Sequence, residues 1–432
     1  MNTNAKRGKR QQYIMESFFK LKTPDEVFDI IDRFHPVGEE TIPLEDAAGR
    51  VLSRDLQAPE DLPGFFRSTM DGYAVKVRST FGANEGLPAL FHLKGEVLMG
   101  GSNRVVVEEG EAVKIPTGGM LPEGADGVVM KEYCSLLDET TLEVSRAISP
   151  LENIIQPGDD FRKGTTFLNK GHRLRPQDLG VMAGLGVSDA PVFRKPKIAI
   201  ISTGDEIVPA DKLCLPGQVR DINRYTLGAL CRRAGAEPLC MGLSPDHFET
   251  LKRMAEKALA QADSLWISGG SSVGTRDLTL KIFEILPHFE LLVHGISISP
   301  GKPTIIGQSG TQPLIGLPGH VASALVVGEV FMTRLISRLS GDAGLSRRFR
   351  ADVEAVLSQN IESASGREDY VRVRLTEEEG GLVARPVFGK SGLISTLVEA
   401  DGLIRIGMNT EGRYQGEKVN VMLFNLADGG PL

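Results

Sequence analysis

Several carboxylates in this 432-residue chain follow apolar runs that are typical of buried strands. The run 197–201 leads to Asp205 and Glu206, and the run 264–267 leads through a glycine- and serine-rich loop to Asp277. Asp246 precedes a helical pattern. Because open α/β sheets bind ligands at the carboxyl ends of their strands, we expect a site here for a phosphate-bearing substrate and a hard cation such as Mg²⁺. Taken singly, each carboxylate is also explained as a helix cap or a solvated loop charge.

Lys302 lies in a turn that the sequence predicts to be rigid. Its surroundings, GISISPGKPT, differ from a phosphate-binding P-loop because five residues rather than four separate Gly295 from Gly301. Pro303 also supplies neither a backbone N–H nor a hydroxyl. The Pro-Gly-Lys-Pro turn can instead present Lys302 to an oxyanion as a point charge. The alternative is an ordinary surface lysine.

Other familiar chemistries leave no signature in the chain. A GxGxxG fingerprint does not follow any predicted strand, which argues against a dinucleotide site. His294 and His320 lie near the strand ends, but neither belongs to a motif for nucleophilic catalysis, so both are interpreted as core or loop histidines.

The composition excludes some classes of protein. A net charge of -7 argues against a nucleic-acid partner, and the chain lacks the roughly 20-residue apolar stretch that a membrane span needs. The four cysteines, Cys134, Cys214, Cys231 and Cys240, form neither a CxxC pair nor a zinc-ligand spacing. They predict reduced thiols in a cytoplasmic protein.

The elements that must position these residues alternate between strand and helix. Helical patterns over 222–234 and 247–262 flank a strand-like run at 238–243, which predicts a parallel sheet covered on both faces. Asp277 is expected at the start of the next helix. We therefore predict a three-layer α/β domain over 194–340.

Three further units complete the predicted architecture. Short β-like segments and glycine-rich turns predict a small, mostly β domain over 62–152, and alternating strands predict a β-barrel over 345–432. Residues 16–61 and 153–193 are expected to form a discontinuous linking domain, with a capped helix beginning at Thr23-Pro24.

The ordered motifs of the chain resemble the molybdopterin molybdenumtransferase family, that is, the bacterial MoeA proteins and the E domain of gephyrin. The resemblance runs from about Thr23 to Phe424. The motifs that carry it are STMDGYAV (68–75), PTGGMLPEGAD (116–126), STGDEIV (202–208), DINR (221–224), SGGSSVGTRD (268–277), PGKPT (300–304) and GLPGHVASA (316–324).

This resemblance implies a reaction as well as a fold. Family members insert molybdenum from molybdate into adenylated molybdopterin with a divalent metal, Mg²⁺, and release AMP. The implied protein is a homodimer whose site is shared between subunits, with an α/β domain similar to molybdopterin adenylyltransferases and such an enzyme as a partner. The alternatives are a tungstate-inserting paralogue and a non-catalytic carrier of the cofactor.

The resemblance also assigns roles to residues. It implies that Asp246 and Asp277 hold the metal and that Asp71 and Thr117 act from the other subunit's small β domain. The implied catalytic set is Asp71, Thr117, Glu206, Asp246 and Asp277, and the implied cofactor-binding set is Gly269, Gly270, Ser271, Lys302, Ser323, Arg367 and Ser391.

The chain departs from the family pattern near Lys302. Many members have a basic residue at the position of Ser299, some have a lysine near Gly295, and Asn usually stands where His320 does. Anion binding in this chain is therefore expected to depend on Lys302 and Arg367.

Overall fold

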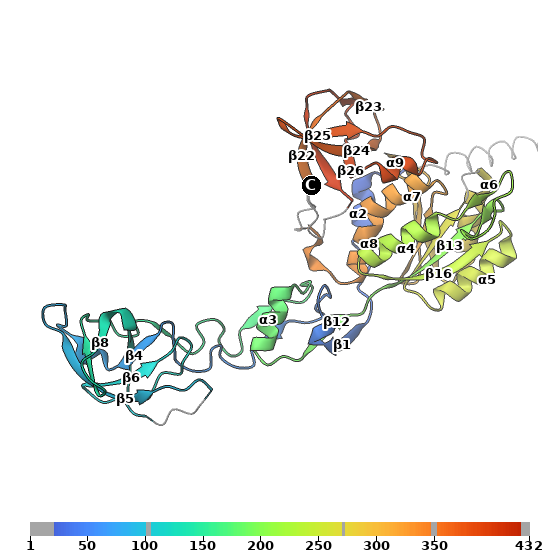
Figure 1. The fold of residues 1–432 in the computed structure, drawn as a ribbon. Coiled ribbons are helices and arrows are strands. Elements are labelled where there is room, and N and C mark those ends of the chain that lie inside the picture. The colour runs from blue at the N-terminus through green and yellow to red at the C-terminus, as the bar shows by residue number, and fades with distance from the viewer. Residues whose placement is uncertain (1–20, 101–104, 270–272, 347–351, 425–432) are drawn as a thin grey trace, which may run out of the picture.

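The computed structural model describes residues 21–100, 105–269, 273–346 and 352–424. The small β domain lies at one end, the linking segments lie in the middle, and the α/β and barrel domains lie together at the other end (Figure 1). The predicted multidomain α/β plus β architecture is confirmed. All four cysteines are free thiols. None of the helices in these ranges combines the length and hydropathy that a bilayer crossing needs.

A six-stranded sheet forms the centre of the α/β domain. Its order is β16 (Glu237–Ser244), β13 (Lys197–Thr203), β17 (Ser264–Gly269), β21 (Gln312–Leu317), β20 (Ile305–Ser309) and β18 (Phe289–His294). The first four strands are parallel, as predicted. β20 runs antiparallel to both of its neighbours, so β18 again points in the direction of the first four strands. Ser309 pairs with Gln312, so β20 and β21 form a tight hairpin in which Gly310 has a φ of +59°. This hairpin explains the change of direction.

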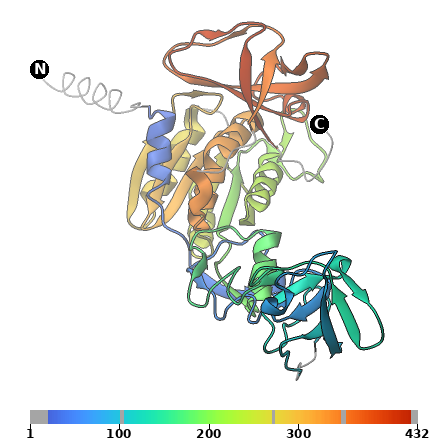
Figure 2. The same cartoon turned by 90° about the vertical axis from the view of Figure 1, so that its left-hand side faces the viewer.

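Helices cover both faces of this sheet, which makes the domain three-layered (Figure 2). One core cluster contains Leu227, Trp266 and Phe331, and the other contains Leu251 and Phe283. The helices on the first face are α4 (Asn223–Arg233), α7 (Val321–Val327), a π-helical turn η4 (Gly328–Met332) and α8 (Thr333–Leu339). The helices on the second face are α5 (Phe248–Leu259) and α6 (Val273–Glu284).

The N-terminal helix α2 (Pro24–Ile31) belongs to the α/β core, which corrects its predicted place in the 16–61 linking segment. It begins as expected, with Thr23 and Glu26 forming a reciprocal capping box. Its apolar face, including Val27 and Ile31, packs on α8 and η4 instead of on the linking strands. Figure 2 shows α2 in blue beside the orange α8.

The chain passes through the middle of the molecule twice, and strands from the first pass pair with strands from the second. β1 (Glu39–Pro43) pairs with β12 (Asp189–Phe193), and β2 (Leu56–Gln57) pairs with β11 (Thr166–Leu168). Leu52, Leu174 and Met182 fill a core beneath α3 (Pro176–Gly184). A short 3-10 turn, η1 (Leu44–Asp46), follows β1.

The small β domain contains one six-stranded sheet with a core on each face. β3 (Arg67–Ser68) and β10 (Ile154–Ile155) pair where the chain enters and leaves it. The sheet strands are, in order, β7 (Gly127–Met130), β4 (Gly72–Val75), β6 (Glu111–Ile115), β5 (Ala89–Glu96), β9 (Thr141–Val144) and β8 (Cys134–Leu136).

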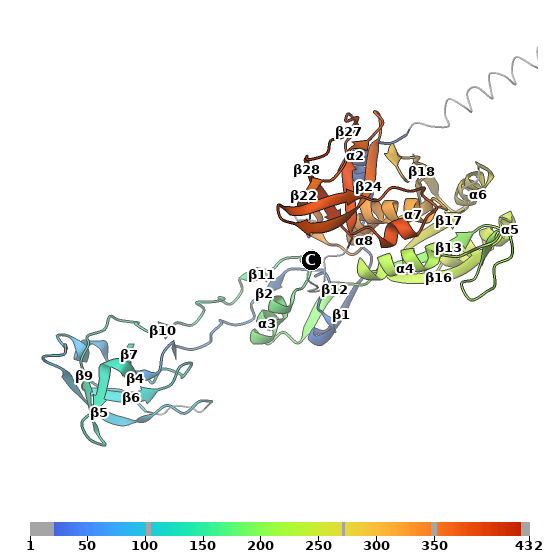
Figure 3. The ribbon, with the colours of Figure 1, turned by 45° about the horizontal axis from the view of Figure 1, so that its top comes forward.

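The C-terminal strands close into a barrel, as predicted. Each of five strands pairs with two others in a ring. β19 (Ile298–Ser299), which comes from the α/β domain, extends this sheet by pairing in parallel with β24. Figure 3 shows the barrel lying against α7 and α8. In ring order, its strands are β22 (Asp352–Leu357), β25 (Gly381–Pro386), β24 (Glu368–Glu378), β26 (Gly402–Ile406) and β28 (Lys418–Leu423), and α9 (Ser395–Val398) packs nearby.

Candidate functional site

The carboxyl ends of the parallel strands bring the predicted acidic residues to one edge. Thr203, the last residue of β13, is level with Ser244 on β16 and with Gly269 on β17. Its Oγ1 donates a 2.7 Å hydrogen bond to Oδ1 of Asp246. The backbone N–H of Asp246 donates to Oδ1 of Asp205 at 3.0 Å. The expected meeting of carboxylates from different strand ends is therefore present.

Asp246 combines partial burial with like charges nearby. Burial raises the pKa of its carboxyl, and the nearby charges of Asp205 and Glu206 raise it further, while the Thr203 hydroxyl partly opposes them. A carboxylate held against like charges in a half-buried position would be stabilised by a bound cation.

The glycine-rich loop after β17 is only partly described. Gly269 is buried, and a Cβ at this position would lie 2.9 Å from Cγ2 of Thr203, so the close approach of the strands requires glycine. Gly270 and Ser271 lie outside the described residues. Helix α6 begins at Val273, so Asp277 lies inside the helix and not at its start, which corrects that prediction and excludes a cap. The side chain of Asp277 also lies outside the described part.

A polar cavity of about 280 Å³ opens at this same edge and contains residues that sequence reasoning did not single out. Asn223, at the start of α4, donates from Nδ2 to Ser268 Oγ at 2.7 Å and to the Gly319 carbonyl at 2.8 Å. Asp221 accepts through Oδ1 from Ser202 Oγ at 2.9 Å. The DINR motif was the available signal for both residues. Glu206 lines the cavity as well.

Two acceptor atoms of this cavity lack a partner. Asp221 Oδ2 and Asn223 Oδ1 are buried, and neither has a hydrogen-bond donor among the described residues. Asp221 is 5% exposed and Asn223 is 8% exposed. Buried acceptors without donors are costly, so the cavity is suited to a ligand that brings N–H or O–H groups. We call this space the polar cavity.

A second cavity of about 520 Å³ brings together Lys302 and Arg367, on which anion binding is expected to depend, and two further residues of the implied cofactor-binding set, Ser323 and Ser391. Lys302 follows β19, Ser323 lies in α7, and Arg367 and Ser391 come from loops of the barrel domain. The β19–β24 pairing, with Ser299 level with Asp369, brings the Lys302 turn to the Arg367 loop. Arg367 Nε lies 3.0 Å from Asp369 Oδ1. We call this space the Lys302 pocket.

The Lys302 turn requires its glycine. Gly301 has a φ of +115°, and a Cβ at this position would lie 2.6 Å from Cγ2 of Val327 and 2.8 Å from Cδ1 of Ile298. Any side chain here would push the turn away from the helix that carries Ser323.

The polar cavity and the Lys302 pocket share a wall. The wall consists of the start of α7 and the Gly389–Gly392 loop, because Ser391 lines the Lys302 pocket and Gly392 lines the polar cavity. Ser391 Oγ lies 3.2 Å from His320 Nδ1, and its carbonyl accepts from the Ala322 N–H at 3.2 Å. His320 is exposed in the loop before α7, which agrees with its interpretation as a loop histidine, and it also lines the polar cavity.

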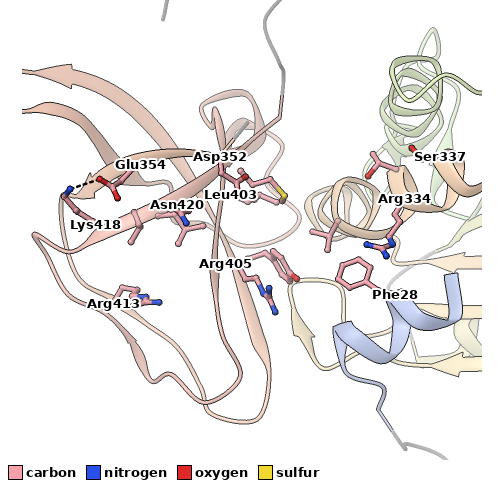
Figure 4. A pocket seen from close by; sticks show the side chains of 16 residues that line it. Phe28, Arg334, Ser337, Asp352, Glu354, Leu403, Arg405, Arg413, Lys418 and Asn420 are labelled. Carbon is pink, nitrogen blue, oxygen red and sulfur yellow. Dashed lines mark hydrogen bonds and ion pairs between the residues drawn. The ribbon is translucent and has the colours of Figure 1, made fainter. Parts of the chain in front are cut away.

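A cavity of about 830 Å³ lies elsewhere, between α2, α8 and the barrel (Figure 4). Its cations are neutralised by carboxylates: Arg334 pairs with Asp32, and Lys418 Nζ lies 2.7 Å from Glu354 Oε1. Arg405 similarly pairs with Glu368. The predicted site residues do not line this cavity, and its paired charges do not favour an anion.

Asp71 and Thr117 contact each other in the small β domain. The backbone N–H and the Oγ1 of Thr117 both donate to Asp71 Oδ1 at 2.9 Å. These bonds, with Lys131 nearby, lower the pKa of the Asp71 carboxyl. The small β domain lies far from the sheet edge of the α/β domain (Figure 1), so this pair does not join the other predicted residues within one chain.

The acidic residues do not form a ready-made metal cage. Within residues 21–424, apart from the gaps in the description, three or more His, Cys, Asp or Glu side chains do not gather in a metal-binding group. Mg²⁺ commonly uses one or two carboxylates with substrate phosphates, so the acidic donor set around Asp246 fits this ion when a phosphate shares it.

Known proteins match the chain along most of its length. The family descriptions that match are MoeA N-terminal region (domain I and II) over residues 22–186, probable molybdopterin binding domain over 199–338, and MoeA C-terminal region (domain IV) over 354–424. A putative molybdopterin biosynthesis protein of Methanocaldococcus jannaschii is 34% identical over 391 residues, which cover 88% of this chain and 91% of that protein.

Two further comparisons agree. A molybdopterin molybdenumtransferase of Haemophilus influenzae is 32% identical over 392 residues, covering 90% of this chain and 95% of that protein. Two solved structures of MoeA proteins from Pyrococcus horikoshii align with a TM-score of 0.80 at 35% and 30% identity, and each alignment covers 94% of this chain and 100% of that one. Together with the domain matches, these similarities mean that this chain belongs to the MoeA family.

Proposed function

We propose that this chain is a molybdopterin molybdenumtransferase that inserts molybdenum from molybdate into adenylated molybdopterin and releases AMP. The observation that carries the proposal is the wall shared by the polar cavity and the Lys302 pocket. A site for a donor-rich heterocycle beside a site for an oxyanion is what this reaction needs, because the two substrates must meet.

The Lys302 pocket is the proposed molybdate site. Lys302 and Arg367 supply positive charge, and the hydroxyls of Ser323 and Ser391 supply neutral donors. A tetrahedral oxyanion has four acceptor oxygens, which a lysine, an arginine and two hydroxyls can hold by charge-assisted hydrogen bonds. The same four side chains could hold tungstate, which is also a tetrahedral oxyanion.

The polar cavity is the proposed place for a ring of the adenylated pterin. Asp221 Oδ2 and Asn223 Oδ1 are acceptors in need of donors. Pterin and adenine rings carry amino N–H groups at their edges and can supply them. Glu206 lines the cavity, and Gly269 is the last residue of β17, which also contributes Ser268 to the cavity, so both remain proposed substrate contacts.

Asp246 is the proposed metal-holding residue on the described side of the site, with Asp277 as its proposed partner. A bound Mg²⁺ would neutralise charge on the phosphate oxygens and polarise the bond that is cleaved. The Thr203 hydroxyl orients the Asp246 carboxylate, and the partial burial of this carboxylate reduces screening by bulk water.

A homodimer would complete the site. Asp71 and Thr117 lie together but far from the Lys302 pocket of their own subunit. The small β domain of a second subunit could bring them to it, as the family resemblance implies. A cytoplasmic location and a molybdopterin adenylyltransferase as supplier of the substrate belong to the same proposal.

The test is AMP release by the purified protein. With adenylated molybdopterin, Mg²⁺ and molybdate, we expect AMP to appear and to require both the metal and the oxyanion. Replacing molybdate with tungstate measures the oxyanion preference. If the pterin nucleotide binds but AMP stays at background, the protein is a carrier of the cofactor and the transferase proposal fails.

A further inference from the structure

Arg372 is a buried arginine of the Lys302 pocket to which the sequence and the family comparisons assign no role. It lies on β24 and is 8% exposed. Its side chain lines the pocket together with Lys302 and Arg367. A buried guanidinium normally has a carboxylate partner, because an unpaired charge is costly away from water.

The hydrogen bonds of Arg372 go to neutral groups. Nη1 donates to Thr396 Oγ1 at 2.8 Å, and Nη2 donates to the Gly389 carbonyl at 2.9 Å. In the part of the chain that the structure describes, Arg372 has no ion pair. Burial lowers the pKa of its guanidinium without an opposing carboxylate. The charge of Arg372 is therefore not compensated by the fold.

The other cations of the pocket differ from Arg372. Arg367 is exposed and is paired with Asp369, and Lys302 is exposed to solvent. Glu362, another lining residue, is an exposed carboxylate. Solvent and salt screen these exposed charges more strongly than the charge of a buried side chain. The carboxylate of Asp369 also lines the pocket and is 6% exposed, but it is paired with Arg367. Arg372 is therefore a buried cation of the pocket whose charge has no carboxylate partner among the described residues.

The same two hydrogen bonds fix the loop that carries Ser391. Gly389 lies at the start of this loop, and Thr396 lies in the first turn of α9. Thr396 Oγ1 also donates to the Leu393 carbonyl at 2.7 Å, so Arg372 braces the loop on both sides of Ser391.

We propose that Arg372 selects the charge of the oxyanion: a tetrahedral dianion in the Lys302 pocket is its counter-charge, and the Arg372 guanidinium holds the Ser391 loop against that anion. This inference rests on the proposed function, because it takes the Lys302 pocket as the molybdate site. It makes Arg372 a positioning and specificity residue.

The experiment compares two tetrahedral anions of similar size and different charge, molybdate at −2 and perrhenate at −1. Their dissociation constants are measured by equilibrium dialysis on the full-length protein. The variants are Arg372→Gln, Arg372→Lys and the control Arg374→Gln, which removes the same charge from an exposed position two residues along β24.

Coulomb's law sets the expected pattern. Removing one positive charge from the pocket changes the binding free energy of a dianion twice as much as that of a monoanion. If Arg372→Gln weakens perrhenate binding about fivefold, it should weaken molybdate binding about 25-fold. Arg372→Lys, which keeps the charge, should retain most of the preference for molybdate, and Arg374→Gln should change neither constant.

If Arg372→Gln weakens the binding of both anions by the same factor, Arg372 only holds the Ser391 loop in place, and the proposal is overturned. If wild-type protein binds neither anion, the molybdate site itself fails, and this inference fails with it. Circular dichroism checks the fold, and Arg372→Met, which fills similar space, replaces the glutamine variant if the latter does not fold.

Discussion

Asn223 should organise the strand-end edge as well as face the polar cavity. It joins α4 to the end of β17 through Ser268 and to the start of α7 through Gly319. Asn223→Ala removes one buried and one partly buried hydrogen bond and leaves the buried Ser268 hydroxyl and the partly buried Gly319 carbonyl without their donor. At about 1 kcal/mol for each bond plus the desolvation left behind, the loss of unfolding free energy should be about 2–4 kcal/mol.

The single tryptophan of the chain makes this loss measurable in the correct domain. Trp266 is fully buried on β17, two residues before Ser268, so its fluorescence reports the unfolding of the α/β core. With a urea dependence of about 2 kcal/mol per molar, the midpoint should fall by about 1–2 M.

A matched control separates this effect from the substitution itself. Asn420 is exposed on the barrel, so Asn420→Ala should change the unfolding free energy by less than about 0.5 kcal/mol. If Asn223→Ala behaves like Asn420→Ala, the two hydrogen bonds do not hold the edge together, and the account of the polar cavity is wrong.

Two more predictions concern the acidic residues. Because the pKa of Asp246 is raised in the folded protein, its ionisation opposes folding, and wild-type stability should fall as pH rises from the ordinary carboxyl range through the folded pKa. Asp246→Asn should remove this fall in stability, be more stable than wild type at pH 7 and release no AMP. Urea midpoints measured by Trp266 fluorescence between pH 4 and pH 7 check the stability. An unchanged pH dependence in Asp246→Asn would contradict the reasoning. For the shared site, Asp71→Asn and Lys302→Ala should each abolish AMP release, and dimers reassembled from an equal mixture should recover roughly a quarter of wild-type activity, because half of them carry one intact site. Absence of recovery in verified heterodimers would place both residues in the same subunit's site.

The sequence predicted the strand-end edge because its cause is local. Apolar runs that end in Gly204-Asp205 or at Gly269 predict strands and loops, and strand–helix alternation makes the strands parallel. The convergence of Asp205 and Asp246 follows from that topology alone. The start of α6 was predicted too late, because glycines and serines favour loops and yet Val273 already begins the helix.

The sequence could not show what depends on distant contacts. The amphipathic pattern of α2 reveals an apolar face but not that the face packs on α8. The Lys302 pocket forms through the β19–β24 pairing of residues about 70 positions apart, and only the family resemblance linked its members in advance. Arg372 and Asn223 look like surface residues in the sequence, because burial of a polar side chain is a property of the folded chain.

The position of bound molybdate tests the central claim most directly. Crystals of the protein soaked with molybdate should give a molybdenum anomalous peak within hydrogen-bonding distance of Lys302, Ser323 and Ser391, and Lys302→Ala should weaken or remove it. A peak in the cavity of Figure 4 instead, or an unchanged peak in Lys302→Ala, would contradict the assignment of the oxyanion site.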